Sequence, residues 1–188
     1  VKEGDTLEGL DRSYLANPRQ WQLLQARNKV ADPRRLQPGS LIFIPVRLQP
    51  SESATVQFVQ GEATAQARGN GTPVPIATGS KLEEGTELKV GPESFVAVQL
   101  ADGTVVRVQA QSELQLRQLR QLRRRGRAGS VQSVLEMHKG GVESTVPPSA
   151  EPLRRMEIRT PLAVTSVRGT QFSVALADSG QTTASVEQ

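Results

Sequence analysis

The sequence predicts a small α+β domain followed by a larger all-β domain, and three observations carry that prediction. Apolar residues recur at helical spacing near the N-terminus, whereas many short strand-like segments follow residue 53. Glycine and proline separate those segments, as in all-β proteins. Aromatic residues make up only 3% of the chain, so the second core must consist of Val, Leu, Ile and Ala. At 188 residues the chain is long enough for two domains.

The N-terminal residues predict two helices. Gly4, Asp5 and Thr6 form a turn that feeds the first helix, because Asp and Thr side chains accept from the free amides at a helix start. The side chains that follow at helical spacing are Leu7, Leu10, Tyr14 and Leu15. Asn17 and Pro18 predict the start of a second helix, because Asn is a favoured N-cap and Pro suits the first helical position.

A strand is predicted after the two helices. Pro33, Pro38 and Gly39 exclude further helix, and the apolar run at residues 41–44 predicts a buried strand that ends at Pro45. Residues 1–2 are interpreted as the stub of an opening strand. The predicted order is therefore strand, helix, helix, strand, or βααβ.

Residues 1–46 resemble a LysM domain, a small module that binds glycans rich in N-acetylglucosamine. The resemblance lies in Gly4-Asp5-Thr6-Leu7 at the start, Asn28 midway, and Leu36-Gln37-Pro38-Gly39 before the apolar run. It implies a shallow groove between two loops, with peptidoglycan as the partner. The implied glycan-binding residues are Gly4, Asp5, Thr6, Leu7, Lys29, Val30, Ala31 and Leu36. Backbone groups would bond the N-acetyl and hydroxyl groups, and Leu7, Val30 or Leu36 would pack on the acetyl methyl.

Residues 47–53 are polar and predict a short linker, and an all-β region follows it. The expected strands are 56–59, 63–67, 87–90, 95–100, 105–108, 113–116, 134–137, 142–146, 156–159, 163–167, 172–176 and 184–186. Asp102-Gly103 predicts a two-residue hairpin turn in which both residues have positive φ. Gly140-Gly141 predicts another turn. This spacing is compatible with a sandwich, a barrel or a solenoid.

Residues 54–188 resemble a FecR domain. The resemblance rests first on the order along the chain of residues 79–82, Gly85, and residues 91–94, 97–104 and 112–114. A later segment, Ile158-Arg159-Thr160-Pro161 with residues 163–172, adds to it. The resemblance implies a twisted, solenoid-like stack of strands and a place in the bacterial envelope, notably in periplasmic parts of regulators that relay receptor occupancy to a sigma factor. The expected location is the bacterial periplasm or cell envelope.

An arginine-rich segment lies within the second region. Six arginines fall within residues 117–127, and no acid occurs between Glu113 and Glu136. The segment is interpreted as a hairpin arm at about residues 112–138, whose arginines keep its edges soluble. An alternative is contact with an anionic polymer through Arg120, Arg123, Arg124, Arg125 and Arg127. Nucleic acid is the least favoured partner, because no aromatic residues are interleaved.

No catalytic, metal-binding or cofactor-binding set is expected, and the chain is not interpreted as an enzyme. It has no cysteine and one histidine, His138, which excludes thiol chemistry, disulfides and the usual zinc sets. Arg168-Gly169-Thr170 is interpreted as a tight bend rather than a ligand site. No apolar run approaches the ~18 residues of a membrane span, and no signal peptide is recognised. Because the chain begins inside a domain pattern, it is expected to be an excised or processed fragment.

Together these observations predict a non-catalytic protein of the bacterial cell envelope. Its LysM-like module would bind peptidoglycan, and its FecR-like domain would present a surface for a protein partner or sense envelope state. Two alternatives stay open. One is a FecR-type periplasmic signalling component, and the other is the accessory region of a cell-wall hydrolase.

Overall fold

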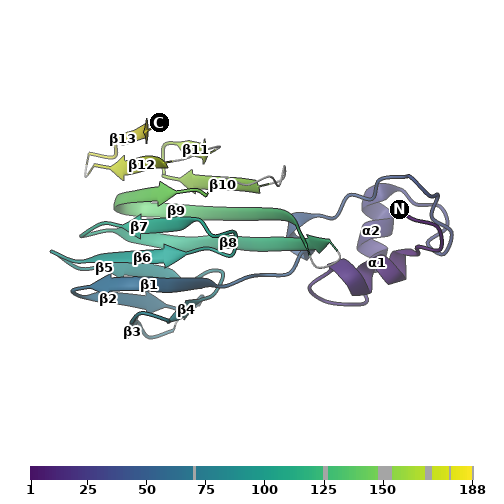
Figure 1. The fold of residues 1–188 in the computed structure, drawn as a ribbon, viewed down its shortest axis with the longest axis horizontal. Coiled ribbons are helices and arrows are strands. Elements are labelled where there is room, and N and C mark those ends of the chain that lie inside the picture. Colours follow the sequence, from purple (N-terminus) through teal and green to yellow (C-terminus); the bar gives the residue numbers. More distant parts are fainter. Residues whose placement is uncertain (70, 125–126, 148–153, 168–170, 178, 188) are drawn as a thin grey trace. The chain divides into compact units, whose positions relative to one another are not determined.

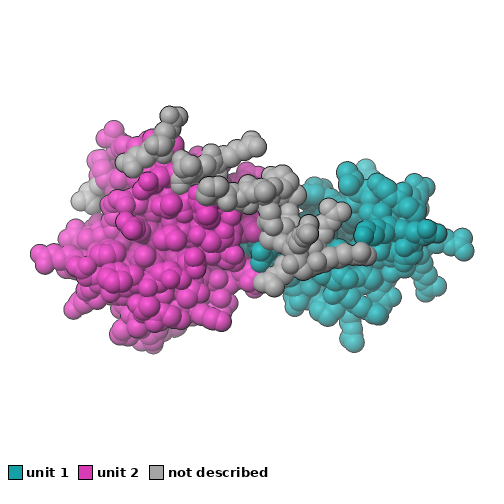
Figure 2. Space-filling view, viewed as in Figure 1, with its two compact units in different colours: residues 1–50, 120–129 teal, residues 51–119, 130–188 magenta. Residues whose placement is uncertain are grey.

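The computed structural model describes the chain except residues 70, 125–126, 148–153, 168–170, 178 and 188. The chain divides into two compact units (Figure 2). Unit 1 comprises Val1–Pro50 and Arg120–Gly129, and unit 2 comprises Ser51–Leu119 and Ser130–Gln188. The boundary at Pro50 and Ser51 falls inside the predicted linker. Residues 120–129, from the predicted hairpin arm, belong to unit 1.

Unit 1 contains the two predicted helices, α1 (Leu7–Tyr14) and α2 (Trp21–Asn28) (Figure 1). The predicted start of α1 is confirmed. Thr6 has extended backbone angles, and its hydroxyl accepts a 3.0 Å hydrogen bond from the Gly9 amide. Thr6 is therefore an N-cap.

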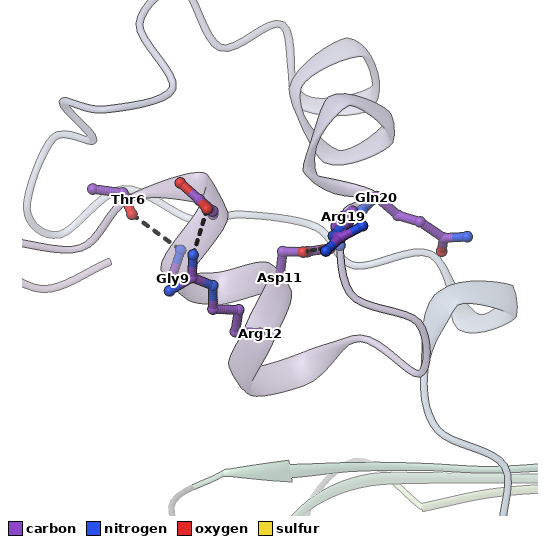
Figure 3. A network of polar contacts seen from close by, with 7 residues as sticks. Thr6, Gly9, Asp11, Arg12, Arg19 and Gln20 are labelled. Carbon is purple, nitrogen blue, oxygen red and sulfur yellow. Dashed lines mark hydrogen bonds and ion pairs between the residues drawn. The ribbon is translucent and has the colours of Figure 1, made fainter.

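The second helix begins at Trp21, so the predicted start at Asn17-Pro18 is wrong. Gln20 occupies the N-cap position without a side-chain cap bond. The cap comes instead from α1, because the Asp11 carboxylate accepts from the backbone amides of Arg19 at 2.6 Å and Gln20 at 2.9 Å (Figure 3). Asp11 is buried. A residue distant in sequence thus sets the start of the helix.

The predicted strand at residues 41–44 is not formed, so the βααβ expectation is met only in its helices. Leu41 and Phe43 are 94% and 55% exposed, while Ile42 and Ile44 pack on the helical core. A strand needs a neighbouring strand with which to form backbone hydrogen bonds. Residues 1–2, the predicted opening strand, bond only to residues that precede 41–44. Val1 accepts from the Gly39 amide at 2.9 Å and its amino group donates to the Ser40 carbonyl at 2.9 Å.

The end of unit 1 is packed rather than solvated. Val46–Leu48 form a 3-10 turn, and both Leu48 and Gln49 are buried. The Gln49 carbonyl accepts from Arg120 Nη1 at 2.6 Å, and the Pro50 carbonyl accepts from the Gln121 amide at 3.1 Å. Part of the predicted linker is therefore held by residues of the predicted arm.

The remainder of the described chain is mostly β. The strands are β1 (Ala54–Gln60), β2 (Ala63–Gln66), β3 (Val74–Pro75), β4 (Lys81–Leu82), β5 (Glu87–Val90), β6 (Phe95–Gln99), β7 (Val105–Val108), β8 (Glu113–Arg124), β9 (Arg127–Thr145), β10 (Arg154–Arg159), β11 (Val164–Val167), β12 (Gln171–Leu176) and β13 (Thr182–Glu187). They form one sheet in the order β3-β2-β5-β8-β9-β7-β6-β1-β4, with the β10/β11 and β12/β13 pairs attached to β9 (Figure 1). The sheet curls into a half-barrel.

Strand β9 changes partners along its length. Its first part pairs in parallel with β10, and its second part pairs antiparallel with β7 and β12. Gly140, with φ of 83°, begins the second part, and the next amide, Gly141 N–H, donates to the Ser112 hydroxyl at 2.9 Å. A Cβ on Gly140 would overlap that hydroxyl. The predicted turn at Gly140-Gly141 is therefore wrong, because the pair makes a bend inside one strand.

The hairpin predicted at Asp102-Gly103 joins β6 and β7, but its turn type differs from the expectation. The Leu100 amide donates to the Thr104 carbonyl at 2.8 Å, which leaves a three-residue loop. Gly103 has φ of 81°, whereas Asp102 is not among the residues with positive φ. A single left-handed glycine after a turn is typical of three-residue hairpin loops.

The core of unit 2 has the aliphatic composition that the sequence predicts. Val, Leu, Ala and Ile dominate it, with Met137, Met156 and one aromatic residue, Phe172. The core of unit 1 is separate and centres on Leu7, Leu24 and Leu36.

Candidate functional site

The two predicted glycan-binding loops lie next to each other in unit 1. The Leu7 amide, in the first loop, donates a 2.9 Å hydrogen bond to the Pro33 carbonyl in the second. Gly4 gives the first loop its turn through a φ of 81°. The Asp5 carboxylate closes that turn by accepting from the Lys2 amide at 2.7 Å. A ligand bound at one of these loops can therefore contact the other loop as well.

The side chains of these loops differ from the expectation. Leu7 is 0% exposed and Leu36 is 9% exposed, because both belong to the helical core. They are not placed to pack on an acetyl methyl group, so that part of the prediction is wrong. Val30 is half-buried against the same core, whereas Lys29 and Ala31 are exposed. The loops thus present backbone and small or charged side chains.

Several polar groups of these loops are already bonded within the protein. The Thr6 hydroxyl caps α1. Val30 exchanges two hydrogen bonds with Gln25, one from its amide and one to its carbonyl, both at 3.1 Å. Lys29 adopts the left-handed conformation that ends α2. These bonds fix the shape of the loops before any ligand arrives.

An exposed apolar surface next to α2 was not predicted. The Asn28 amide group bonds both backbone groups of Phe43, at 2.7 and 2.9 Å, as a strand partner would. Arg27 lies 5.2 Å from the centroid of the Phe43 ring. Leu41 and Phe43 are exposed and Ile42 and Ile44 are half-buried, but all four residues are apolar, so the sequence carries no alternation that could have indicated this surface.

The predicted arginine surface is described only in part. Arg125 lies outside the described residues, as do the side chains of Arg123, Arg124 and Arg127. Arg120 is bonded to the Gln49 carbonyl, and Arg117 forms a 2.8 Å ion pair with Glu136. The two described arginines of this segment are thus engaged within the protein. The bend predicted at residues 168–170 also lies outside the described residues.

One pair of opposite charges is buried in unit 2. Arg154 Nε lies 3.0 Å from Asp102 Oδ2, and the two side chains are 17% and 2% exposed. Arg154 also donates to the backbone carbonyls of Pro147 at 2.6 Å and Asp102 at 2.7 Å. The same carboxylate accepts from the Thr104 amide and hydroxyl. This network fixes the β6–β7 loop.

A second charge cluster lies on β10. Glu157 accepts from Arg155 Nε at 2.6 Å, and from Arg159 Nη2 at 2.7 Å and Nε at 3.1 Å. The Arg159 hydrogen bond is the largest influence and holds the pKa of Glu157 below its ordinary value, with Arg155 acting in the same direction and burial opposing both. The Glu157 carboxylate therefore stays ionised although only 3% of the side chain is exposed.

In the part of the chain that the structure describes, no three His, Cys, Asp or Glu side chains are grouped as a metal site would require. No helix among the described residues has the length and apolar character needed to cross a membrane.

These features define a class of mostly β proteins with a curled sheet and a small helical unit. The family model described as FecR protein matches residues 86–188, more than half of the chain. The chain therefore belongs to the FecR family, which is associated with signalling in the cell envelope. No curated protein and no solved structure matches it. The comparisons give no support to the LysM resemblance of residues 1–46.

Proposed function

We propose that this chain is a non-catalytic protein of the bacterial cell envelope that binds peptidoglycan through residues 1–46. Its FecR region then contacts a protein partner or senses envelope state. The observation that favours glycan binding is the hydrogen bond from the Leu7 amide to the Pro33 carbonyl. It joins the two loops between which a LysM domain would hold N-acetylglucosamine.

The structure limits how these loops would bind a sugar. Because Leu7 and Leu36 are buried, the contacts come from the backbone of both loops, from Lys29 and from the surface beside Ala31. Neutral sugars suit such a site, since backbone amides and carbonyls supply directed hydrogen bonds to acetamido and hydroxyl groups. Each contact of this kind is weak, so several copies on one glycan would strengthen retention.

A pull-down of the whole chain on insoluble peptidoglycan tests this proposal. Ala31→Arg places a long charged side chain on the exposed loop, while Ala26→Arg makes the same change on the exposed face of α2. We expect Ala31→Arg to lose most of the retained protein and Ala26→Arg to be retained like the wild type. Soluble N-acetylglucosamine oligomers should release the wild type. Equal retention of both variants and the wild type would contradict glycan binding by these loops.

The FecR match favours a second role, that of a periplasmic signalling component. Expression of envelope genes, measured in cells that produce the wild type, the Ala31→Arg variant or neither, tests it. If the chain is a regulator, cells with the wild type and cells with the Ala31→Arg variant change expression of the same genes relative to cells with neither protein. No change in any case would contradict the signalling role and leave the binding test unaffected.

For the FecR region, a twisted, solenoid-like stack is the arrangement we infer. Strands β1, β4, β6 and β7 pair within one set, and β2, β3, β5 and β8 pair within another, so the chain passes repeatedly from one set to the other. The chain crosses between the two sets at corners such as Gly61, which has φ of 75°. This repeated crossing supports the inference.

A further inference from the structure

Three charged side chains of β10 lie on one face of the sheet. Residues 155, 157 and 159 alternate with Met156 and Ile158, which are buried in the core of unit 2. Arg155 and Arg159 reach Glu157 from its two sides, one to each carboxylate oxygen. The three residues are called the β10 triad below.

The β10 triad has an excess positive charge. Its single carboxylate is ionised, as the lowered pKa of Glu157 indicates, while both arginines are cationic. Glu157 is 3% exposed, whereas the side chains of Arg155 and Arg159 are 66% and 43% exposed. The anion is thus covered, and the cations face solvent.

The acid of β9 that is in register with the triad does not neutralise this excess. Glu136 of β9 is in register with Arg159, but its carboxylate is paired with Arg117 of β8 at 2.8 Å. The residue of β9 in register with Arg155 is Gln132, which is uncharged. Among the described residues, the recorded bonds of the triad occupy Arg155 Nε and Arg159 Nε and Nη2. The remaining guanidinium N–H groups are available to a ligand.

We propose that the β10 triad binds a phosphate group, with Arg155 and Arg159 as its donors and Glu157 as the residue that positions them. A guanidinium presents its N–H groups as a rigid fork that matches an oxyanion. Because Glu157 already restrains both side chains, less rotamer entropy is lost on binding than for two free arginines. A phosphate has more oxygens and more charge than a carboxylate, so it suits two converging guanidinium groups better.

Titration of the whole chain with inorganic phosphate, followed by the NMR signals of arginine Nε–H groups, tests the proposal. We expect shifts confined to Arg155 and Arg159, and an affinity that falls at least about tenfold in the double variant R155Q/R159Q. The matched control is R68Q/R107Q, which removes the same charge from two exposed arginines, one just after β2 and one in β7, and leaves the Arg117–Glu136 pair intact. We expect it to bind phosphate within about twofold of the wild type.

The double variant also leaves Glu157 buried without a partner, so its folding must be checked. The variant R155K/R159K keeps both charges and a partner for Glu157, but loses the planar forks. We expect R155K/R159K to fold and to bind phosphate more weakly than the wild type. Unchanged affinity in this folded variant, or equal losses in R155Q/R159Q and its control, would overturn the proposal.

Two further ligands define the chemistry. Dimethyl phosphate represents a phosphodiester, and acetate represents a carboxylate. Binding of dimethyl phosphate with shifts at the same two arginines would place a phosphodiester among the ligands, and preference for inorganic phosphate would indicate a monoester. Acetate bound as tightly as phosphate would overturn the assignment to phosphate. None of these outcomes depends on glycan binding by unit 1.

Discussion

Asp11 in α1 caps α2 through the backbone amide of Gln20, 2.9 Å from its carboxylate. A second bond joins the carboxylate to the Arg19 amide at 2.6 Å, and Arg19 has the unfavourable φ of 76°. A non-glycine residue with positive φ costs free energy, so these two bonds also stabilise a strained connection. The pairing of the two helices in unit 1 therefore depends on one buried acid.

We predict that Asp11→Ala lowers the free energy of unfolding of unit 1 by about 1–2 kcal/mol, because two amides lose their acceptor. Asp11→Asn keeps one acceptor and should lose less. Hydrogen exchange at the Arg19 and Gln20 amides, compared with urea unfolding, measures both effects. The control is Glu8→Ala, which removes an exposed acid of the same helix. Unchanged protection of both amides in Asp11→Ala would contradict the capping role.

Gly140→Ala should destabilise unit 2 more than a glycine substitution at an open turn. The new methyl group would meet Ser112, and the backbone at φ of 83° disfavours any side chain. We expect a loss of more than about 2 kcal/mol, compared with about 1 kcal/mol for Gly79→Ala, which has φ of 88° and no atom within 4 Å.

The double variant Gly140→Ala/Ser112→Ala separates the two causes of that loss. It removes the hydroxyl that the new methyl group would strike but keeps the unfavourable φ and the Ser112 Cα and Cβ atoms, at 2.7 and 2.8 Å from that methyl group, so it should recover only part of the stability relative to the sum of the single changes. Urea unfolding of the four proteins measures this coupling. Additive losses would show that the Ser112 hydroxyl does not contribute to the clash with the new methyl group.

Acidification should weaken unit 2 through Glu157. The folded state lowers the pKa of this carboxyl from 4.5, so its contribution is present above that value and is lost as pH falls through the lower, folded value. Glu157→Gln should therefore be less stable than the wild type at neutral pH, and the difference should shrink at about pH 3. Urea unfolding of both proteins at the two pH values measures the change. If the stability difference between the two proteins were the same at both pH values, Glu157 would be excluded as the source of the pH dependence.

Arg154→Gln should cost about 3 kcal/mol, because it leaves the Asp102 carboxylate buried without its cation. Arg117→Gln breaks an exposed pair and should cost no more than about 1 kcal/mol. Thermal unfolding of the two variants gives the comparison. Similar losses of stability in the two variants would contradict a larger contribution from the buried Arg154–Asp102 pair.

The sequence predicted most strands of unit 2 to within a few residues, including β5, β7 and β12. It missed the two-residue strands β3 and β4, since so short a segment has no periodicity. It also divided β9 into two strands at Gly140-Gly141. Glycine permits both a turn and a bend, and the choice between them came from the hydroxyl of Ser112, which lies just before β8.

The candidate site in unit 1 was likewise predicted from the sequence only in part. The loops that would hold a glycan could be placed from sequence, because turn residues and helix caps act locally. The burial of Leu7 and Leu36 could not, since both would also suit an exposed apolar contact. The β10 triad was missed because a residue pattern of Arg, Glu and Arg does not show which member is covered.

The sequence by itself determined the two helices, the aliphatic core of the β region and the hairpin at Asp102-Gly103, because each depends on residues close together along the chain. Only the tertiary structure decided how α2 is capped, where β9 bends and which charges are buried. Those features depend on Asp11, Ser112 and Arg154, whose partners are brought to them by folding. Local preferences restrict the backbone of each segment, but contacts between segments select among the conformations that remain.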